Sequence, residues 1–303
     1  KLDEVLRVAD DVTVVRAGET VAEVKSKDVT ARQLAELMVG SELPQPTTHG
    51  DTRRSEVTLE LKDVSIPTAT GSRDLISHIS FNLHAGEVVG IAGVEGNGQA
   101  ELVEAIMGLR NYTGSIDFQG SSIDHMSVAH RHDLGIGLIP EDRQRQALMM
   151  DSPLWENRIL GHQRGKPVMR GFILDRKATI EDTKRIMEEF DVRAPGPMTA
   201  AAALSGGNQQ KFIVGREMSK APALLLASHP TRGVDIGAQG AIWEVLREAR
   251  SKGMAIVLIS ADLEELIGMS DRLLVMLRGA ITAELDPQKT TPEQLGSAMT
   301  GAA

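Results

Sequence analysis

Two glycine-containing segments of this chain carry the residue types that bind phosphate groups. The first spans residues 204–211, with the sequence LSGGNQQK, and the apolar residues after it have the spacing of a partly buried helix. The N–H groups of a first helical turn have no partner within the helix and lie at the positive end of its dipole. A serine and two glycines at this point suit a bound phosphate, although a serine that only caps the helix would have the same sequence.

The second segment, residues 93–101, has the glycine spacing of a phosphate-binding loop. Its sequence is GVEGNGQAE, and it lies between a strand-like stretch at 88–92 and a helix-like stretch at 102–109. A complete loop reads Gly-x-x-x-x-Gly-Lys-Ser/Thr, in which the lysine reaches the terminal phosphates and the hydroxyl binds Mg²⁺. Here Gln99 stands at the lysine position, Ala100 at the hydroxyl position, and Glu101 adds a carboxylate. The segment is either a phosphate loop without its cation or an unrelated glycine-rich turn.

Together, the two segments resemble the signature motif and the phosphate loop of the ABC-transporter ATPases. LSGGNQQK is similar to the signature of the carbohydrate and nucleoside importers in that family. The resemblance implies that the signature contacts ATP held by a second domain, through Leu204, Ser205, Gly206, Gly207, Asn208 and Gln209. It also implies a nucleotide site of the chain's own at Gly93, Gly96, Asn97, Gly98, Gln99, Ala100, Glu101 and Glu141, where Glu141 replaces the glutamine of the Q-loop.

The positions that carry hydrolysis in these ATPases are altered in this chain. The family places an aspartate and a glutamate after the strand at 224–227, and here these positions hold Ser228 and His229. Its switch histidine is replaced by Ala261, whereas Asp235 matches the D-loop aspartate. The resemblance therefore implies no catalytic residue and no metal site here, with degenerate positions at Gln99, Ser228, His229 and Ala261. The alternative is that His229 acts as a base, since its ordinary pKa is about 6.5.

The two ends of the chain repeat one another. Residues 1–40 align without a gap to residues 262–301, and twelve of the forty positions are identical. Such self-similarity indicates duplicated architecture. We expect residues 1–40 to be the C-terminal tail of a first ATPase domain, 41–56 a linker, and 57–301 a second domain with a helical subdomain at about 146–203. The chain would then be part of a longer tandem ATPase, the alternative being a natural mature chain that starts at Lys1.

Composition limits the possible partners. The net charge is −9, which argues against nucleic acid or anionic lipid as the main partner, and there is no cysteine for a disulfide framework. The hydrophobic content of 41% is sufficient for one sizeable core and a smaller unit. The longest apolar runs, such as 255–259, are too short to span a bilayer.

The elements that position these motifs alternate between strand and helix, which indicates a largely parallel sheet with helices on both faces. A helical stripe at Ile242, Val245, Leu246 and Ala249 and the two tryptophans, Trp155 and Trp243, are expected in the core. Residues 271–285 read as a β-hairpin, 176–192 as a helix, and 291–298 as a short helix capped by Thr291. The resemblance specifies the class: an α/β P-loop NTPase-like ABC ATPase domain with an antiparallel β subdomain and a helical subdomain.

As a whole, the chain resembles the C-terminal half of the ATP-binding subunit of a bacterial importer for a nucleoside or a simple sugar. The resemblance implies ATP and Mg²⁺ as cofactors of the full-length subunit, weakly bound or absent at this domain's own site. It implies as partners the N-terminal ATPase domain of the same polypeptide, membrane permease subunits and, indirectly, a solute-binding protein, at the cytoplasmic face of the membrane. The full-length subunit would be an ATPase and this fragment alone inactive. The alternatives are a soluble ABC protein without a permease and a scaffold that binds no nucleotide.

Overall fold

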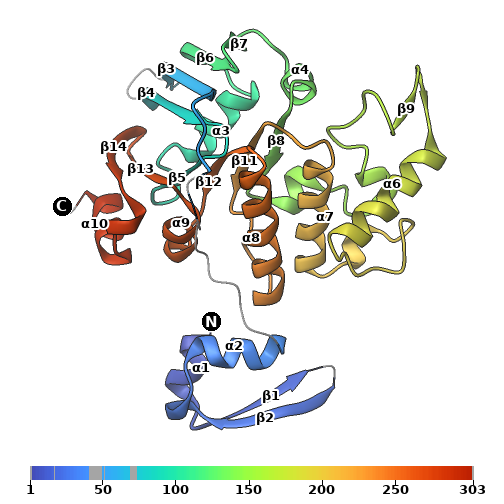
Figure 1. The fold of residues 1–303 in the computed structure, drawn as a ribbon, viewed down its shortest axis with the longest axis vertical. Helices are drawn as coiled ribbons and strands as arrows, with labels where there is room; N and C mark the ends of the chain where they lie inside the picture. The colour runs from blue at the N-terminus through green and yellow to red at the C-terminus, as the bar shows by residue number, and fades with distance from the viewer. Residues whose placement is uncertain (1, 17, 41–49, 51, 69–73, 302–303) are drawn as a thin grey trace.

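The computed structural model describes residues 2–16, 18–40, 50, 52–68 and 74–301, and its largest element is a six-stranded sheet (Figure 1). The strand order is β14-β13-β5-β12-β11-β8, and all neighbours are parallel except the edge strand β14. The strands are β5 (Val88–Ala92), β8 (Ile136–Ile139), β11 (Leu224–Ser228), β12 (Ala255–Ile259), β13 (Arg272–Leu277) and β14 (Ala280–Leu285). β5, β11 and β12 are buried along their whole length, as parallel strands covered on both faces should be.

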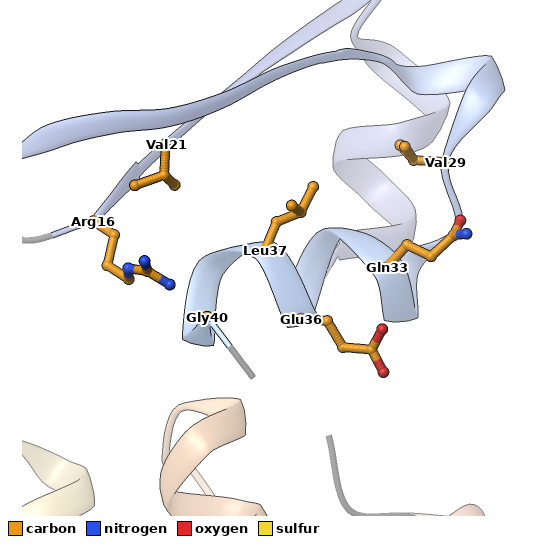
Figure 2. A pocket seen from close by; sticks show the side chains of 7 residues that line it. All are labelled: Arg16, Val21, Val29, Gln33, Glu36, Leu37 and Gly40. Carbon is orange, nitrogen blue, oxygen red and sulfur yellow. The ribbon is translucent and has the colours of Figure 1, made fainter. Parts of the chain in front are cut away.

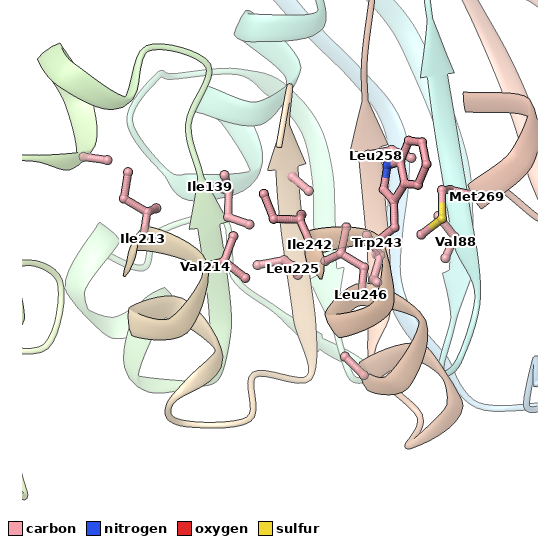
Figure 3. Packing of buried hydrophobic residues seen from close by; sticks show 14 of the residues in the cluster. Val88, Ile139, Ile213, Val214, Leu225, Ile242, Trp243, Leu246, Leu258 and Met269 are labelled. Carbon is pink, nitrogen blue, oxygen red and sulfur yellow. The ribbon is translucent and has the colours of Figure 1, made fainter. Parts of the chain in front are cut away.

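Four helices pack on one face of this sheet: α7 (Gly206–Met218), α8 (Ile236–Ser251), α9 (Leu263–Met269) and α10 (Pro292–Thr300). Figure 3 shows apolar side chains of the strands, such as Leu225 and Leu258, against those of the helices, such as Val214 and Leu246. The stripe expected on the helix at 242–249 faces this layer, which confirms that prediction. Trp155 and Trp243 are both buried, as expected.

The other face packs against α3 (Gln99–Met107) and a four-stranded antiparallel sheet of order β4-β3-β6-β7. Its strands are β3 (Val57–Pro67), β4 (Asp74–His84), β6 (Thr113–Phe118) and β7 (Ser121–Ser122). Apolar residues alternate along these strands because only one face of the small sheet meets the core. The predicted fold class, an α/β P-loop NTPase-like domain with an antiparallel β subdomain, is confirmed.

The helical region lies between β8 and β11. Its elements are a short π-helix (Arg143–Ala147), α5 (Leu154–Asn157), α6 (Arg176–Glu189) and a 3₁₀ turn (Ala201–Ala203), and α4 (Val128–Asp133) precedes β8. The helix predicted at 176–192 ends three residues earlier in the structure. The small hairpin of β9 (Met169–Arg170) and β10 (Ile173–Leu174) was not predicted, because two-residue strands are too short to show alternation. No helix within the described ranges is long and apolar enough to cross a bilayer.

The N-terminal unit has the same element order as the C-terminal end. It consists of α1 (Leu2–Val8), β1 (Asp11–Arg16), β2 (Glu19–Lys25), a 3₁₀ turn (Ser26–Asp28) and α2 (Ala31–Val39). Its counterparts are α9, β13, β14, a 3₁₀ turn (Pro287–Lys289) and α10 (Pro292–Thr300). Each element of the N-terminal unit begins at the residue that the sequence repeat aligns with the first residue of its counterpart.

The repeat extends to irregular details of the two units. Both hairpins shift register at equivalent points, between Val14 and Val15 and between Val275 and Met276. Both terminal helices have a capping box, formed by Thr30 with Gln33 and by Thr291 with Gln294, and both end at a glycine with positive φ. The hairpin predicted at 271–285 and the helix predicted from Thr291 are both present.

The expected linker differs from the structure at its C-terminal end. Most of the segment, residues 41–49 and 51, lies outside the described residues. Thr52 donates a hydrogen bond to the carbonyl of Gly86 at 2.7 Å, and the Arg54 guanidinium donates to the carbonyl of Lys252 at 3.0 Å. Residues 52–56 are therefore fastened to the large domain, because their polar groups find partners on it.

Candidate functional site

The carboxyl ends of four parallel strands bring most of the predicted nucleotide-site residues to one edge of the sheet. Ser228 pairs with Ile259, Ile259 with Ile91, and Ala227 with Ile139, so β5, β12, β11 and β8 end at the same level. The loops that follow begin with Gly93, Ser260, His229 and Pro140. A crevice at the carboxyl ends of the strands is where open α/β sheets bind ligands.

The phosphate-loop segment lies between β5 and α3, as the sequence predicts. Gly98 is the N-cap of α3 and has a φ of 108°, which only glycine adopts easily. Gln99, at the first position of the helix, is 8% exposed. Its side chain is therefore directed into the protein rather than toward solvent.

The carboxamide of Gln99 is hydrogen-bonded within its own loop. The backbone N–H of Asn97 donates to Oε1 of Gln99 at 3.2 Å, and Nε2 of Gln99 donates to the carbonyl of Val94 at 3.2 Å. A Cβ at Gly93 would lie 2.3 Å from the same Nε2, so the loop closes tightly around this side chain. At the position where a phosphate loop has a charged lysine, this loop has a neutral amide that is hydrogen-bonded to its own backbone.

Asn97 fastens the loop to the β13–β14 hairpin. Its Oδ1 accepts a hydrogen bond from the backbone N–H of Arg278 at 2.6 Å, and its carbonyl accepts from the N–H of Gly279 at 3.0 Å. Its own Nδ2 donates to the carbonyl of Val94 at 2.9 Å. The loop is thus held in a fixed conformation by side chains of the protein.

His229 lies between β11 and β12 in a strained backbone conformation. Its φ is 50°, and its N–H donates to the carbonyl of Ile259 at 2.7 Å. The N–H of Ala261 donates to Nδ1 of His229 at 3.2 Å, so this ring nitrogen is an acceptor and the imidazole is neutral. Burial lowers the pKa of His229, partly opposed by the charge of Glu141.

Glu141 and Arg232 form an ion pair at the edge of the crevice. Nη1 of Arg232 donates to Oε1 of Glu141 at 2.6 Å. The carboxylate at the Q-loop position is therefore engaged by a residue of the loop after β11. Ser228, 7% exposed at the end of β11, completes the set of predicted positions at this edge.

The signature residues form a separate, well-capped helix start. Ser205 is the N-cap of α7, and its Oγ accepts from the backbone N–H of Asn208 at 3.4 Å and from Nδ2 of Asn208 at 3.1 Å. A Cβ at Gly207 would lie 3.0 Å from the carboxylate of Asp235, which is itself the N-cap of α8. The missing side chains at Gly206 and Gly207 thus let the first turn of α7 pack closely against the D-loop.

Arg143 is a residue of this region to which the sequence assigned no role. Its guanidinium donates to the carbonyl of Arg232 at 2.6 Å, to that of Gly233 at 3.3 Å and to Oε1 of Gln209 at 3.4 Å. It therefore connects the loop after β8, the loop after β11 and the signature helix. An arginine next to the Q-loop position is the sequence signal that could have indicated it, because a guanidinium has five donors in a fixed geometry.

Glu265 is a second residue without a predicted role. It is fully buried, and its carboxylate accepts from Oγ of Ser260 at 2.5 Å, Nε1 of Trp243 at 2.7 Å and Oγ1 of Thr231 at 2.9 Å. Burial raises the pKa of this carboxyl. The network joins α8 and α9 to the loops that carry His229 and Ala261.

A family model for the ABC transporter matches residues 76–232, more than half of the chain. The chain belongs to this family. Binding of ATP with Mg²⁺ is a property of the family, and the match ends within the loop after β11, which carries His229. The two glycine-rich segments therefore belong to an ABC ATPase domain.

The chain is similar to several import ATP-binding proteins over nearly all of its own length. It is 40% identical to a nucleoside import ATP-binding protein of Lactococcus lactis, with 99% of this chain and 60% of the relative covered. It is 39% identical to a guanosine import ATP-binding protein of Bacillus subtilis (97% and 58% covered) and 40% to a glucose import ATP-binding protein of Haloferax volcanii (99% and 55%). The chain thus spans between 55% and 60% of the length of these relatives.

Solved structures of ABC cassettes have the same fold. An ATP-binding cassette of an ABC transporter in its ADP conformation superposes with a TM-score of 0.65 at 21% identity, covering 81% of this chain and 96% of the other. A dimeric cassette in a post-hydrolysis state with ADP and phosphate gives a TM-score of 0.65 at 20% identity, covering 77% and 100%. At this identity the likeness establishes the fold.

One hollow of the ABC chain lies away from the crevice, in the N-terminal unit. It has a volume of about 590 Å³ and is lined by Arg16, Val21, Val29, Gln33, Glu36, Leu37 and Gly40. Figure 2 shows these residues on the β1–β2 hairpin, on α2 and on the segment that joins them. No motif that the sequence singles out contributes to it.

Proposed function

We propose that this chain is the C-terminal part of a tandem ATP-binding subunit of an importer, and that its own nucleotide site does not hydrolyse ATP. The observation that carries the proposal is the position of Gln99, whose carboxamide is hydrogen-bonded to the backbone of its own loop. Ala100 has no hydroxyl for Mg²⁺, and Ser228 has no charge for its coordination shell. Mg-ATP does not fit this set of residues, so the site would bind nucleotide weakly or not at all.

The signature end of the molecule retains what a phosphate needs. We assign to Ser205 and to the N–H groups of Gly206 and Gly207 the role of contacting ATP held by an upstream domain. Donors oriented in advance stabilise charge that develops on a transferred phosphoryl group without further reorganisation. Arg143 and Asp235 would keep this helix start in place, since both lie directly against it.

The structural repeat supports an upstream ATPase domain. In the second copy, β13 lies between β14 and β5, whereas β1 pairs with β2 alone within the described residues. Val15 is 62% exposed on β1, but its counterpart Met276 is fully buried. The remaining length of the relatives is sufficient for a domain that supplies the strand equivalent to β5 and the rest of the core.

The names of the relatives suggest the solute and the partners. Nucleoside, guanosine and glucose import proteins are among them, so we propose a nucleoside or a simple sugar as the transported solute. The Ser228-His229 pair favours the nucleoside branch. A membrane permease would dock near residues 141–157 at the cytoplasmic face of the membrane. Closure of the two ATPase domains would move the permease. A solute-binding protein would act indirectly.

The ATPase rate of the full-length subunit tests the proposal. Ser205→Ala is expected to lower turnover by about 10²- to 10³-fold, the range for the loss of one preoriented donor. Gln99→Ala should leave turnover unchanged, because the second site does no chemistry. Unchanged turnover in Ser205→Ala would favour a scaffold that binds no nucleotide, and purification without any membrane protein would favour a soluble ABC protein.

The isolated 303-residue chain provides an independent test of the inactive site. It should show no ATPase activity above buffer. If the chain hydrolyses ATP and His229→Ala abolishes that activity, the histidine acts as a base and this part of the proposal is wrong.

A further inference from the structure

Two histidines and a glutamate lie together at the C-terminal end of α7, outside the residues of the predicted nucleotide motifs. His132 is in the last turn of α4, His162 follows α5, and Glu217 is in the last turn of α7. One ligand atom from each lies within 4.8 Å of the other two. We propose that these three side chains form a binding site for a divalent transition metal ion such as Zn²⁺.

The separations suit a metal ion. Nε2 of His132 lies 3.4 Å from Oε2 of Glu217, and Nε2 of His162 lies 3.9 Å from Oε1. Around a tetrahedral Zn²⁺ with bonds of about 2.0–2.1 Å, neighbouring ligand atoms are roughly 3.3 Å apart. The two distances involve different oxygens of Glu217, so its carboxylate must rotate to bring one oxygen and the two ring nitrogens to one ion.

His162 is the group that points to a ligand. Its side chain is 1% exposed, and neither of its ring nitrogens has a hydrogen-bond partner. A buried polar atom without a partner costs about 1–3 kcal/mol, so most such atoms in native proteins are paired. A metal ion would satisfy one nitrogen by coordination. The pair of imidazoles and a carboxylate is a common ligand set for zinc, with a fourth position left for water.

The surrounding charges lower the affinity that the site can have for a cation. Two arginines lie nearby, and each is paired with a carboxylate: Arg158 with Asp182 at 2.6 Å and Arg216 with Glu217 at 2.9 Å. Arg216 donates to Oε1 of Glu217, while Oε2 accepts a hydrogen bond from the backbone N–H of Leu138 at 3.4 Å and lies 3.4 Å from Nε2 of His132. Glu217 thus divides its charge between Arg216 and the ion, which predicts weaker binding than in a closed cysteine site.

The site has a route to solvent and a consequence for the fold. His132 is 13% exposed, and a Cβ at Gly161 would lie 3.0 Å from its Nε2, so the glycine keeps this side of the ring open. A bound ion would join α4, the segment after α5 and α7. It would therefore fix the C-terminal end of the helix whose first turn carries the signature.

Cobalt titration of the metal-free 303-residue chain tests the proposal. We expect one equivalent of Co²⁺ to bind with the visible absorption of a tetrahedral site, and Zn²⁺ to displace it. His132→Ala and His162→Ala should each weaken binding at least about tenfold, because loss of an outer partner already costs 10–100-fold. The control is His125→Ala, an exposed histidine of the same region, which should bind like the wild type.

The outcomes are distinguishable even if the buried variant fails to fold. His132→Asn changes the more exposed ligand. It should leave the circular dichroism spectrum unchanged and lower the affinity for the metal ion. Absence of a tetrahedral spectrum, or binding that persists in both His132→Asn and His162→Ala, would overturn the proposal.

Discussion

The side-chain oxygen of Gln99 lies 3.2 Å from the backbone nitrogen of Asn97, so one of the loop's N–H groups is bonded to the chain's own amide. In a phosphate loop such N–H groups surround the phosphates. The replacement of lysine by glutamine therefore removes a charge and engages one of the loop's N–H donors. Two separate substitutions are needed to restore a phosphate loop, one at Gln99 for the cation and one at Ala100 for the Mg²⁺ ligand.

The double variant Gln99→Lys/Ala100→Ser should gain nucleotide binding without gaining turnover. A hydrogen bond to a charged group contributes about 1.5–3 kcal/mol, which corresponds to about ten- to a hundredfold in affinity. Turnover should stay at background because Ser228 and His229 still provide no carboxylate. Calorimetry with ATP measures the affinity, and Gln99→Met, without a charge, is the matched control. Equal affinities for the two would contradict the explanation.

Arg143 should control the order of the signature helix start. Arg143→Ala removes donors to the carbonyls of Arg232 and Gly233 and to Gln209, so amides near 205–209 and 232–235 should exchange with deuterium faster. Arg143→Lys should not restore protection, because an ammonium lacks the planar fork. Arg145→Ala, an exposed neighbour, serves as the control. If Arg143→Ala and Arg145→Ala exchange alike, Arg143 does not connect the three segments.

Much of the fold could be predicted from the sequence, and the reasons are local. Apolar runs such as 255–259 identify buried strands, and the self-alignment locates both hairpins. The arrangement of Gln99 within its loop could not be predicted, because a glutamine there could equally face solvent. The contacts of Arg143, and the meeting of His132, His162 and Glu217, depend on chain segments that only the tertiary fold brings together. The motifs predicted which residues belong to the candidate site, while the hydrogen bonds of those residues depend on the tertiary fold.

Glu265 should be important for stability. Glu265→Ala leaves the Ser260, Trp243 and Thr231 donors without a shared acceptor, and the free energy of unfolding should fall by at least about 3 kcal/mol. Glu264→Ala, one residue away and exposed, should cost no more than about 1 kcal/mol. Urea unfolding followed by circular dichroism measures both. Similar losses in the two variants would show that the network contributes little.

His229 should make the domain less stable in acid. Burial lowers its pKa in the folded state, so below its ordinary pKa of about 6.5 the unfolded chain binds a proton that the folded chain does not. Stability then falls as pH decreases through that range. His229→Asn keeps an acceptor for the N–H of Ala261 and tolerates the positive φ, so its unfolding temperature should depend less on pH. Thermal unfolding between about pH 5 and 7.5 provides the comparison, and identical slopes would exclude His229 as the cause.

The free edge of β1 should become protected in the full-length subunit. In the second copy, the strand equivalent to β1 is β13, which pairs with β5 in parallel through residues 272–275. Within the described part of this chain, β1 pairs only with β2, so its outer amides are open to solvent and should exchange rapidly.

If an upstream domain supplies the equivalent of β5, the same amides become hydrogen-bonded and buried. Deuterium exchange measured on both forms should slow at residues 11–14 by at least about a hundredfold, since opening then costs about 3 kcal/mol or more. β13 is the internal control, because it should be protected in both forms, and rapid exchange of β1 in the full-length subunit would contradict the tandem arrangement.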